Sequence, residues 1–402
     1  MKTLIIGSRI PYPLHDGGAI ATYNMLKGLS EAGVEVHYYS INTKKHFVDD
    51  ATIKKQFAFL RNIKTFYIDT DIKLMPALRS LISGKSYNLE RFYDLNFEND
   101  LIKYIQSHQF DLIHFEGLYV AYYAFKIVEN SNAPIVLRQH NIEYKIWETL
   151  AANTKAIHKK ILFGYFAKQI KRFETNFLNL FDGIVTIAKT DEKIIKEHQY
   201  INLLTTIPAG IENNFVQQES RVNSKYVYHI GSMEWMPNQQ AMLWFAENVW
   251  KLVIQKVPDA QFYMAGKNMA EKFKLLQTDN FHVIGEVKDL KEFIADKSIL
   301  VVPLMSGSGI RIKTIEGLFA KKAIVSTSIG AKGIDVIDRQ DCMIADDPET
   351  FANAVIEMIQ NPSLRQEIAE NGYQLAIENY DNQNVSKLWL AFYKKVMDEF
   401  DY

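Results

Sequence analysis

Short apolar runs alternate with longer amphipathic segments along most of the chain. The run at 298–304, SILVVPL, is bounded by polar or small residues and is too short for a helix, which is typical of a strand buried on both faces. Further strands are predicted at 2–8, 34–40 and 323–327. Because helical patterning lies between these runs, the sequence predicts an α/β protein built from successive βαβ units.

The unit between 298 and 327 contains a glycine turn at the start of its helix. The sequence SGSG at 306–309 follows the first strand, and Ile312, Ile315 and Phe319 then recur at helical spacing. Residues with little side-chain bulk let the backbone approach a ligand closely. The start of a helix also offers unpaired N–H groups, so this turn is a candidate anion site.

Two cations, Arg311 and Lys313, lie at that helix start and indicate a phosphate-bearing ligand. The helix dipole penalises a cation there by roughly 0.3 to 1 kcal/mol, whereas a phosphate or diphosphate would form charge-assisted hydrogen bonds with both side chains. Glu316, about one turn further on, suits a pair of ribose hydroxyls. A plain βαβ crossover with solvated charges stays open as the alternative. The turn is no GxGxxG fingerprint, because Ile312 stands where the third glycine would be.

The N-terminal strand at 2–8 leads to a second glycine turn. Gly17 and Gly18 come just before a helix that ends at Gly33, so they offer another possible anion site at the carboxyl edge of a sheet. A glycine turn without a ligand is the alternative.

Polar and titratable side chains collect after two further predicted strands. The segment DLIHFEG ends its strand at 114–116, and APIVLRQHNIEYKIW continues past its strand with His140, Asn141 and Glu143. Open α/β sheets bind ligands at such strand ends. His140 is the candidate for the chemistry, although a lone histidine there also occurs as a hydrogen-bonded structural residue. Glu143 either orients an acceptor hydroxyl or caps the following helix.

Length and charge narrow the class of protein. A chain of 402 residues suits two domains, and a formal charge of −1 argues against a general nucleic-acid binder. The single cysteine, Cys342, excludes an intrachain disulfide and favours a reducing cytoplasm. We expect no signal peptide ahead of the first strand, because the apolar run there is too short, and we expect no membrane span, because no apolar window is long enough to cross a bilayer.

Two charged segments have open interpretations. Asp69 and Asp71 spell DXD, a metal-binding motif, but nothing nearby supplies further oxygen ligands, so we expect no metal. The segment 155–172 is rich in lysine and has an apolar stripe. It is either a solvated helical face or a surface for anionic lipid or a phosphate-bearing lipid acceptor.

A polar, aperiodic stretch at 217–225 predicts the linker between two domains, and a second βαβ series starts after it. In that series the loop 231–238, GSMEWMPN, follows the first strand, and Asn238 is positioned to cap the next helix.

The segment 306–327, SGSGIRIKTIEGLFAKKAIVST, resembles the GxGxRxKxxEAxAxGxPVVST variant found in retaining GT-B glycosyltransferases of family 4. Other stretches are similar as well: the opening around Gly17, LRQHN at 137–141 against "TxHD", IPAGIENNF at 207–215 against "VPNGID", and GEVKDL at 285–290 against "GxVxDL". The resemblance implies two Rossmann-like, doubly wound parallel-sheet domains facing an interdomain cleft. Residues 1–215 would form the acceptor-side domain, 216–380 the nucleotide-sugar-binding domain, and 381–402 a helix that packs back on the first.

The resemblance also implies roles for individual residues. His140 would contact the donor sugar, with Asn141 and Glu143 on the acceptor side, and Val287 would meet the nucleotide base through its backbone. The full set expected to bind the donor is Gly17, Gly18, Gly231, Val287, Ser308, Gly309, Ile310, Arg311, Lys313 and Glu316.

Two departures from the family pattern stand out. Ser308 replaces the first of two glutamates usually separated by seven residues, the second being Glu316. The loop 231–238 carries no cation where the family usually has an arginine and a lysine, so Arg311 and Lys313 would neutralise the diphosphate instead.

The implied activity is transfer of a sugar from a UDP- or GDP-type donor to a saccharide or lipid-linked acceptor hydroxyl. We expect retention of configuration, no metal or other cofactor, a role in cell-surface polysaccharide or glycolipid synthesis, and no nucleic-acid partner. The expected location is the cytoplasm, with a peripheral position on the inner face of the membrane if 155–172 binds lipid. A catalytically silent GT-B scaffold and a sugar-nucleotide epimerase or hydrolase are the alternatives. The missing fingerprint weighs against an NAD-linked oxidoreductase.

Overall fold

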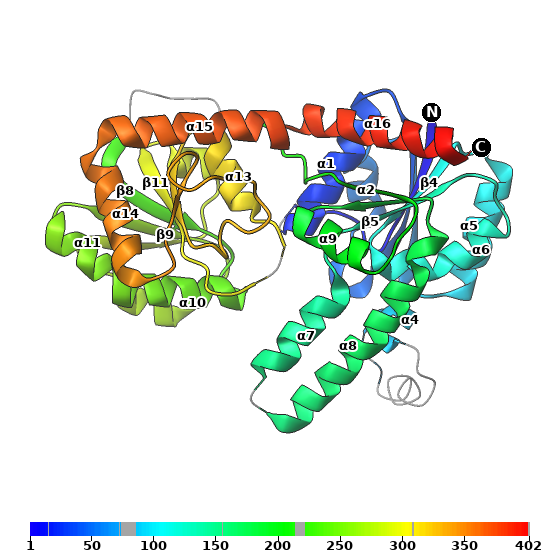
Figure 1. The fold of residues 1–402 in the computed structure, drawn as a ribbon, viewed down its shortest axis with the longest axis horizontal. Helices are drawn as coiled ribbons and strands as arrows, with labels where there is room; N and C mark the ends of the chain where they lie inside the picture. Colours follow the sequence, from blue (N-terminus) through cyan, green and yellow to red (C-terminus); the bar gives the residue numbers. More distant parts are fainter. Residues whose placement is uncertain are drawn as a thin grey trace. The chain divides into compact units, whose positions relative to one another are not determined.

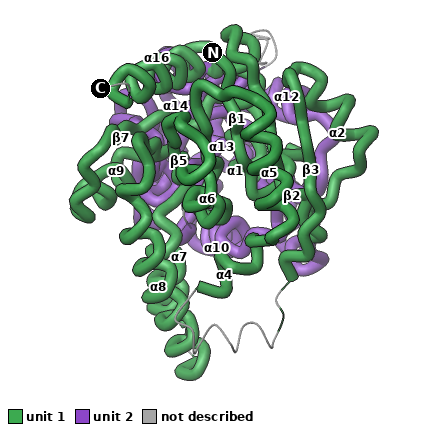
Figure 2. Tube along the Cα trace, turned by 90° about the vertical axis from the view of Figure 1, so that its right-hand side faces the viewer, with its two compact units in different colours: residues 1–210, 382–402 green, residues 211–381 purple. Residues whose placement is uncertain are grey.

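The computed structural model describes residues 1–14, 16–71, 73, 86–154, 156–213, 222–307 and 309–400. The chain forms two compact units, and each has its own sheet (Figure 1). Unit 1 contains residues 1–210 and 382–402, and unit 2 contains residues 211–381 (Figure 2). The last helix of the chain therefore belongs to the unit formed by the first half of the sequence.

Within its described part, unit 1 has a seven-stranded sheet in the order β3-β2-β1-β4-β5-β6-β7, with every pair parallel. This is a doubly wound order, and it places a switch point between β1 and β4, where such sheets bind ligands. The strands are β1 (Lys2–Gly7), β2 (Glu35–Thr43), β3 (Asn62–Ile68), β4 (Leu112–Glu116), β5 (Ile135–Gln139), β6 (Gly183–Thr186) and β7 (Leu203–Thr206). The helices are α1 (Gly17–Glu31), α2 (Asp50–Gln56), α4 (Tyr87–Glu90), α5 (Leu95–Ser107), α6 (Ala124–Val128), α7 (Glu143–Asn153), α8 (Ile157–Phe177), α9 (Lys189–Glu197) and α16 (Asn382–Phe400).

Unit 2 repeats this plan with a parallel sheet of six strands among its described residues, in the order β10-β9-β8-β11-β12-β13. Its switch point lies between β8 and β11. The strands are β8 (Asn223–Ile230), β9 (Gln261–Ala265), β10 (Phe281–Gly285), β11 (Lys297–Val302), β12 (Ala323–Ser326) and β13 (Met343–Ile344). The helices are α10 (Met236–Trp244), α11 (Lys251–Lys256), α12 (Leu290–Ile294), α13 (Ile312–Phe319), α14 (Pro348–Gln360) and α15 (Pro362–Tyr380). Both halves thus have the predicted doubly wound α/β architecture.

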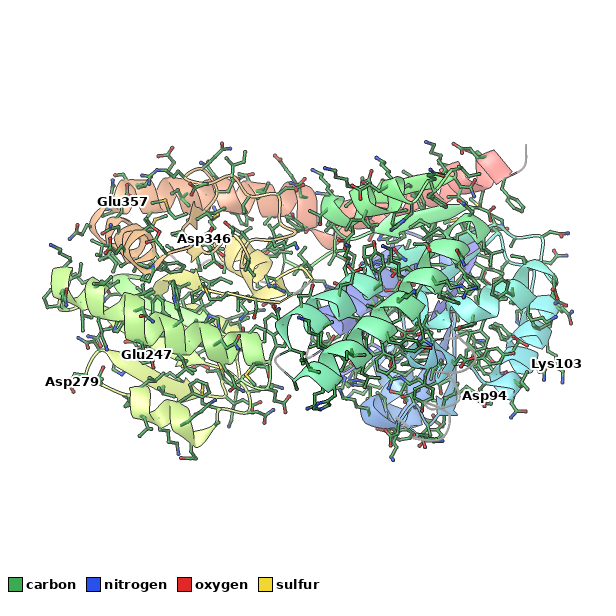
Figure 3. The ribbon with its side chains drawn as sticks, turned by 60° about the horizontal axis from the view of Figure 1, so that its bottom comes forward. Asp94, Lys103, Glu247, Asp279, Asp346 and Glu357 are labelled. Carbon is green, nitrogen blue, oxygen red and sulfur yellow. The ribbon has the colours of Figure 1, made fainter. Side chains whose placement is uncertain are left out.

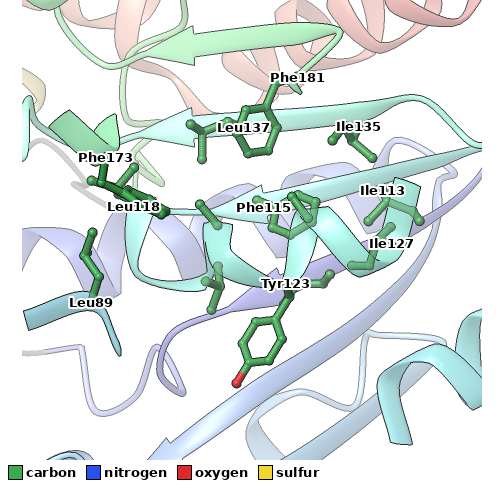
Figure 4. Packing of buried hydrophobic residues seen from close by; sticks show 14 of the residues in the cluster. Leu89, Ile113, Phe115, Leu118, Tyr123, Ile127, Ile135, Leu137, Phe173 and Phe181 are labelled. Carbon is green, nitrogen blue, oxygen red and sulfur yellow. The ribbon is translucent and has the colours of Figure 1, made fainter. Parts of the chain in front are cut away.

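The sheet of unit 1 is covered on both faces, as its nearly continuous apolar strands predict. Ile113 and Phe115 of β4 pack in one cluster with Leu137 of β5 and Phe181 (Figure 4). Leu112 of β4 points to the other face and packs in a second cluster. Charged side chains such as Lys103, Glu247 and Asp279 are exposed and point outward from their own units (Figure 3).

Helix α16 completes the second cluster of unit 1. Its Val385, Trp389, Phe392, Tyr393 and Val396 recur at helical spacing and are all buried. Each large apolar side chain buried in this way contributes about 1.5 to 3 kcal/mol. α16 approaches α1 so closely that a Cβ atom on Gly28 would overlap the hydroxyl of Ser386. The buried face of α16 thus forms part of the core that also contains residues of β1, β4 and β6.

Candidate functional site

The glycine turn of unit 2 lies between β11 and α13, at the switch point of the sheet. Gly307 and Gly309 have φ angles of 119° and 79°, a region that favours glycine. A Cβ atom on Gly307 would lie 2.7 Å from the indole of Trp235, so there is no room for a side chain. Ser308, one of the predicted donor-binding residues, lies outside the described residues. Gly309 is exposed and Ile310 is half-buried in the same turn.

Arg311 is buried at the N-terminus of α13, with 5% of its surface exposed. Its Nη1 donates to the carbonyl oxygen of Gly309 at 2.9 Å, and its guanidinium carbon lies 5.1 Å from the centroid of the Trp235 ring. Burial lowers the pKa of Arg311 to about 10. The side chain therefore remains a cation at neutral pH, and the indole face offsets part of its desolvation.

Lys313 extends from the first turn of α13 to the loop after β8. Its Nζ donates to Oδ1 of Asn238 at 2.8 Å and lies 3.2 Å from Nε2 of His229. A Cβ atom on Gly231 would overlap this Nζ and would lie 2.6 Å from Nδ2 of Asn238. Glycine at 231 is therefore what makes room for the lysine. Lys313 thus supplies the cation that this loop lacks in its own sequence.

The amine of Lys313 titrates close to neutrality. Desolvation by burial, together with the charge of Arg311, lowers the pKa of Lys313 to about 7, and Glu316 acts in the opposite direction. Burial also raises the pKa of Glu316 to about 7, although the charge of Lys313 opposes this shift. An anion placed here would stabilise the charged form of the lysine.

Three residues that contact this cluster were not among the predicted donor-binding residues. Trp235 contacts both Gly307 and Arg311, and His229 and Asn238 hold Lys313. The prediction that Asn238 caps the following helix is wrong, because α10 begins at Met236 and the Asn238 amide donates instead to the carbonyl of Ser232 at 2.8 Å. The predicted Val287 lies after β10 and is half-buried.

Unit 1 has a buried charge cluster at its own switch point, centred on Glu116 at the end of β4. Oε1 of Glu116 accepts hydrogen bonds from Oγ1 of Thr22 (2.8 Å), Nη1 of Arg138 (3.0 Å) and Nε2 of His140 (2.6 Å). Oε2 lies 2.9 Å from Nε2 of His114. The cluster joins α1, β4, β5 and the loop after β5.

The charge of Glu116 is fixed by its neighbours. Burial alone would raise the pKa of this carboxyl group, but the charges of Arg138 and His140 and the hydrogen bonds from His114 and His140 outweigh burial and hold the pKa well below its usual value. Arg138 is fully buried and its guanidinium carbon lies 5.3 Å from the ring centroid of Trp389 in α16. His140 is the partly open member, with 22% of its side chain exposed.

The glycine pair of unit 1 lies at the start of α1 as predicted, next to a cation that the sequence analysis missed. Arg9 binds both carboxylate oxygens of Asp16, which caps α1 by accepting from the backbone N–H of Ala19 at 3.0 Å. A Cβ atom on Gly18 would lie 3.0 Å from Nη2 of Arg9. The turn therefore brings a guanidinium group to the start of the helix.

The predicted acceptor-side residues Asn141 and Glu143 follow β5. Glu143 is the first residue of α7, and Oε2 of Glu143 accepts from the hydroxyl of Tyr119 at 3.0 Å. Burial raises the pKa of Glu143 to about 7, although the Tyr119 hydrogen bond opposes this shift. The α7 N-terminus is capped by Glu174 of α8, whose carboxylate accepts from the backbone N–H groups of Glu143 and Tyr144.

No group of three or more metal-ligating side chains occurs among the described residues. The two carboxylates of the DXD sequence pair with lysines, Asp71 with Lys44 at 2.5 Å and Asp69 with Lys73 at 3.3 Å.

Family models account for most of the chain. The model described as Glycosyltransferase Family 4 matches residues 15–215, and that described as Glycosyl transferases group 1 matches residues 224–361. The chain therefore belongs to glycosyltransferase family 4. A Klebsiella pneumoniae protein described as an uncharacterized 44.6 kDa protein in the cps region is 25% identical over 401 residues, which are 96% of this chain and 97% of that protein.

Solved structures of other proteins share the fold over nearly the whole chain. Anabaena HepE in complex with UDP has a TM-score of 0.68 at 13% identity and covers 98% of this chain and 100% of its own. Sucrose-phosphate synthase from Thermosynechococcus elongatus has a TM-score of 0.71 at 12% identity. The match covers 99% of this chain and 100% of the synthase chain. The fold is thus GT-B, as the sequence predicted.

A helix hairpin of unit 1 carries residues 157–172 of the basic segment singled out in the sequence, and Lys155 lies outside the described residues. Helices α7 and α8 lie side by side and extend away from the sheet of their unit (Figure 1). Ile157 and Ile161, near the start of α8, are 74% and 70% exposed, and the neighbouring Lys159 and Lys160 are exposed as well. In the part of the chain that the structure describes, no helix combines the length and apolar character needed to cross a bilayer.

Proposed function

We propose that the protein transfers a sugar from a nucleotide-diphosphate sugar to an acceptor hydroxyl. The observation that carries this proposal is the pair of cations, Arg311 and Lys313, held at the start of α13 beside a glycine turn. Burying two like charges against the positive end of a helix is costly unless an anion joins them. A donor of the UDP or GDP type supplies that anion, and the UDP bound to HepE, which has the same fold, favours UDP.

The cations would act on the leaving group. Cleavage of the bond between sugar and diphosphate gives the sugar oxocarbenium character and increases the negative charge on the diphosphate. Donors fixed near the diphosphate stabilise the transition state more than the ground state, because the charge grows there. Glu316 would accept hydrogen bonds from ribose hydroxyls, with Gly231 and Gly309 admitting the ligand to the backbone and Val287 facing the base.

Unit 1 would supply the groups for the sugar and the acceptor. His140 would contact the sugar, Gly17 and Gly18 would lie near the diphosphate, and Asn141 and Glu143 would orient the acceptor hydroxyl. We infer retention of configuration, with the departing phosphate accepting the proton of the acceptor, and chemistry that needs no metal.

The acceptor would be a saccharide or a lipid-linked saccharide in the synthesis of cell-surface polysaccharide or glycolipid. The Klebsiella relative is described as a protein in the cps region, and this description supports a polysaccharide pathway. A lipid-linked acceptor would bring the protein to the cytoplasmic face of a membrane. The exposed isoleucines and lysines of α8 have the composition that binds anionic lipid.

A thermal-shift screen against UDP, GDP, ADP, CMP and their sugars tests the donor class. We expect one nucleoside diphosphate and its sugars to stabilise the protein, because a ligand that binds only the folded protein raises the midpoint of thermal unfolding. Release of that nucleotide in the presence of a polysaccharide acceptor then tests transfer. Release with water alone would favour a hydrolase, and binding without turnover on any acceptor would favour a silent scaffold.

A further inference from the structure

Both oxygens of the Glu116 carboxylate already accept hydrogen bonds from protein groups. Four donors surround it, because Thr22, Arg138 and His140 bond to Oε1, and His114 bonds to Oε2. Each carboxylate oxygen has about two lone-pair sites, so the three donors at Oε1 leave no room there for another, and Oε2 already accepts one hydrogen bond. Glu116 is also buried, with 4% of its surface exposed. Its function must therefore be exerted through one of its four partners.

His140 is the partner that reaches solvent, since Thr22, Arg138 and His114 are all buried. Nε2 of His140 lies 2.6 Å from Oε1 of Glu116, and an ionised carboxylate only accepts hydrogen bonds. Nε2 therefore carries a proton. In the neutral ring the other nitrogen, Nδ1, must then have a free lone pair.

The opposite side of the carboxylate is fixed in the same way by α16. Nδ1 of His114 lies 2.6 Å from the hydroxyl of Tyr393, and Nε2 of His114 faces Oε2 of Glu116. Burial lowers the pKa of His114, so the ring is neutral and donates from Nε2 while Tyr393 donates to Nδ1. A continuous path of hydrogen bonds thus runs from α16 through His114 and Glu116 to His140.

We propose that Glu116 is the positioning residue of His140, fixing the ring with Nε2 protonated so that Nδ1 accepts a hydrogen bond from a hydroxyl of the bound sugar. The identity of this ligand rests on the proposed sugar transfer, whereas the protonation pattern does not. Glu116 acts by orienting the ring, since a ring free to rotate would lose the fixed direction of its lone pair.

The protonation pattern is tested directly by nitrogen-15 NMR of the histidine-labelled full-length protein, with His140→Gln used to assign the signal. We expect His140, in its neutral form, to show a protonated Nε2 and an unprotonated Nδ1, with a slowly exchanging Nε2 proton at low field. A proton on Nδ1 would overturn the proposal. The double variant Glu116→Met/Arg138→Met removes both buried charges together, so no unpaired charge remains to unfold the protein. It should lose the low-field proton, and an unchanged signal would also overturn the proposal.

A double-mutant cycle separates positioning from a general structural role. Glu116→Gln should lower kcat about tenfold, because a neutral acceptor is roughly half as strong as a charged one, and should change the KM for the donor by less than about twofold. In the His140→Ala background the same substitution should lower kcat less than about twofold. An equal loss in both backgrounds would contradict the proposal. If the wild-type protein shows no transfer, the proposed function fails while the NMR result still decides the role of Glu116.

Discussion

Nζ of Lys313 lies 3.2 Å from Nε2 of His229, a nitrogen that can only accept. The other ring nitrogen of His229 donates to the carbonyl of Val301 at 2.9 Å, which fixes the tautomer. Burial and the charge of Lys313 hold the pKa of His229 well below its usual value, so the imidazole stays neutral. The lysine is therefore held by two neutral acceptors, His229 and Asn238, and keeps its charge available for an anion.

Donor binding should weaken as the pH rises above neutrality. The pKa of Lys313 is about 7 in the free protein, and a diphosphate binds its protonated form better. Binding at pH 8 should then take up a proton, and affinity should fall by up to about tenfold between pH 7 and pH 8.5. Titration calorimetry in buffers of different ionisation enthalpy measures the proton uptake. Lys313→Gln should bind more weakly at every pH and lose the uptake, and uptake that persists in this variant would assign it to another group.

Gly231→Ala should weaken donor binding about tenfold or more with little loss of stability. The new methyl group would overlap Nζ of Lys313, the far end of a flexible side chain that moves at low cost. The ammonium would then leave the position between Asn238 and His229. Gly164→Ala is a matched control, because it lies on exposed α8 with open space at its Cβ position. The control should bind like wild type and gain up to about 1 kcal/mol of stability, and equal binding by both variants would contradict the assigned role of Gly231.

The protein should lose stability as the pH rises from about 5 to 8, through Glu174. Burial raises the pKa of Glu174 to about 8, whereas an unfolded glutamate titrates near 4.3. The folded protein binds more protons than the unfolded chain between these values, so this contribution is present at low pH and is lost on raising the pH. Glu174→Gln keeps an oxygen for the α7 backbone and should flatten the pH dependence of the thermal midpoint. Glu129→Gln, an exposed control, should leave this pH dependence unchanged. Identical plots of thermal midpoint against pH for wild type and Glu174→Gln would exclude Glu174 as the source of the stability loss.

The start of α8 should bind vesicles that contain an anionic phospholipid. Lys159→Glu/Lys160→Glu should lower co-sedimentation with these vesicles several-fold, because each lysine near an anionic surface contributes about 1 kcal/mol. Lys54→Glu/Lys55→Glu makes the same charge change on an exposed pair in α2 and should have little effect. Equal losses in both variants would mean that net charge, and not this helix, attracts the lipid.

Local patterns in the sequence identified those parts of the fold and of the site that are formed by residues close together in the sequence. The apolar runs at 298–304 and 323–327 became β11 and β12, and the glycine turn placed Arg311 and Lys313 at the start of α13. These features depend on residues within one βαβ unit. The resemblance to family 4 extended the prediction to the GT-B fold, which the comparisons confirm.

The partners of those cations were not predictable in the same way. His229 lies within β8, where a histidine in a strand gives no sign of a ligand, and it meets Lys313 across 84 positions of sequence. Trp235 resembles any half-exposed aromatic residue in a loop until the fold brings it against Gly307. Likewise, the strand-end residues Glu116 and His140 were both recognised as polar, but only the parallel pairing of β4 and β5 brings them together.

Titration calorimetry of UDP and GDP against wild type, Arg311→Gln and Arg339→Gln tests the central claim most directly. Arg339 is an exposed arginine of unit 2 that pairs with Glu357, so its variant controls for loss of a positive charge. We predict that one of the two nucleotides binds wild type and Arg339→Gln equally and binds Arg311→Gln about 10- to 100-fold more weakly, as expected for a lost hydrogen bond to a charged group. Equal binding to all three proteins, or no binding of either nucleotide to wild type, would contradict a diphosphate site at the start of α13.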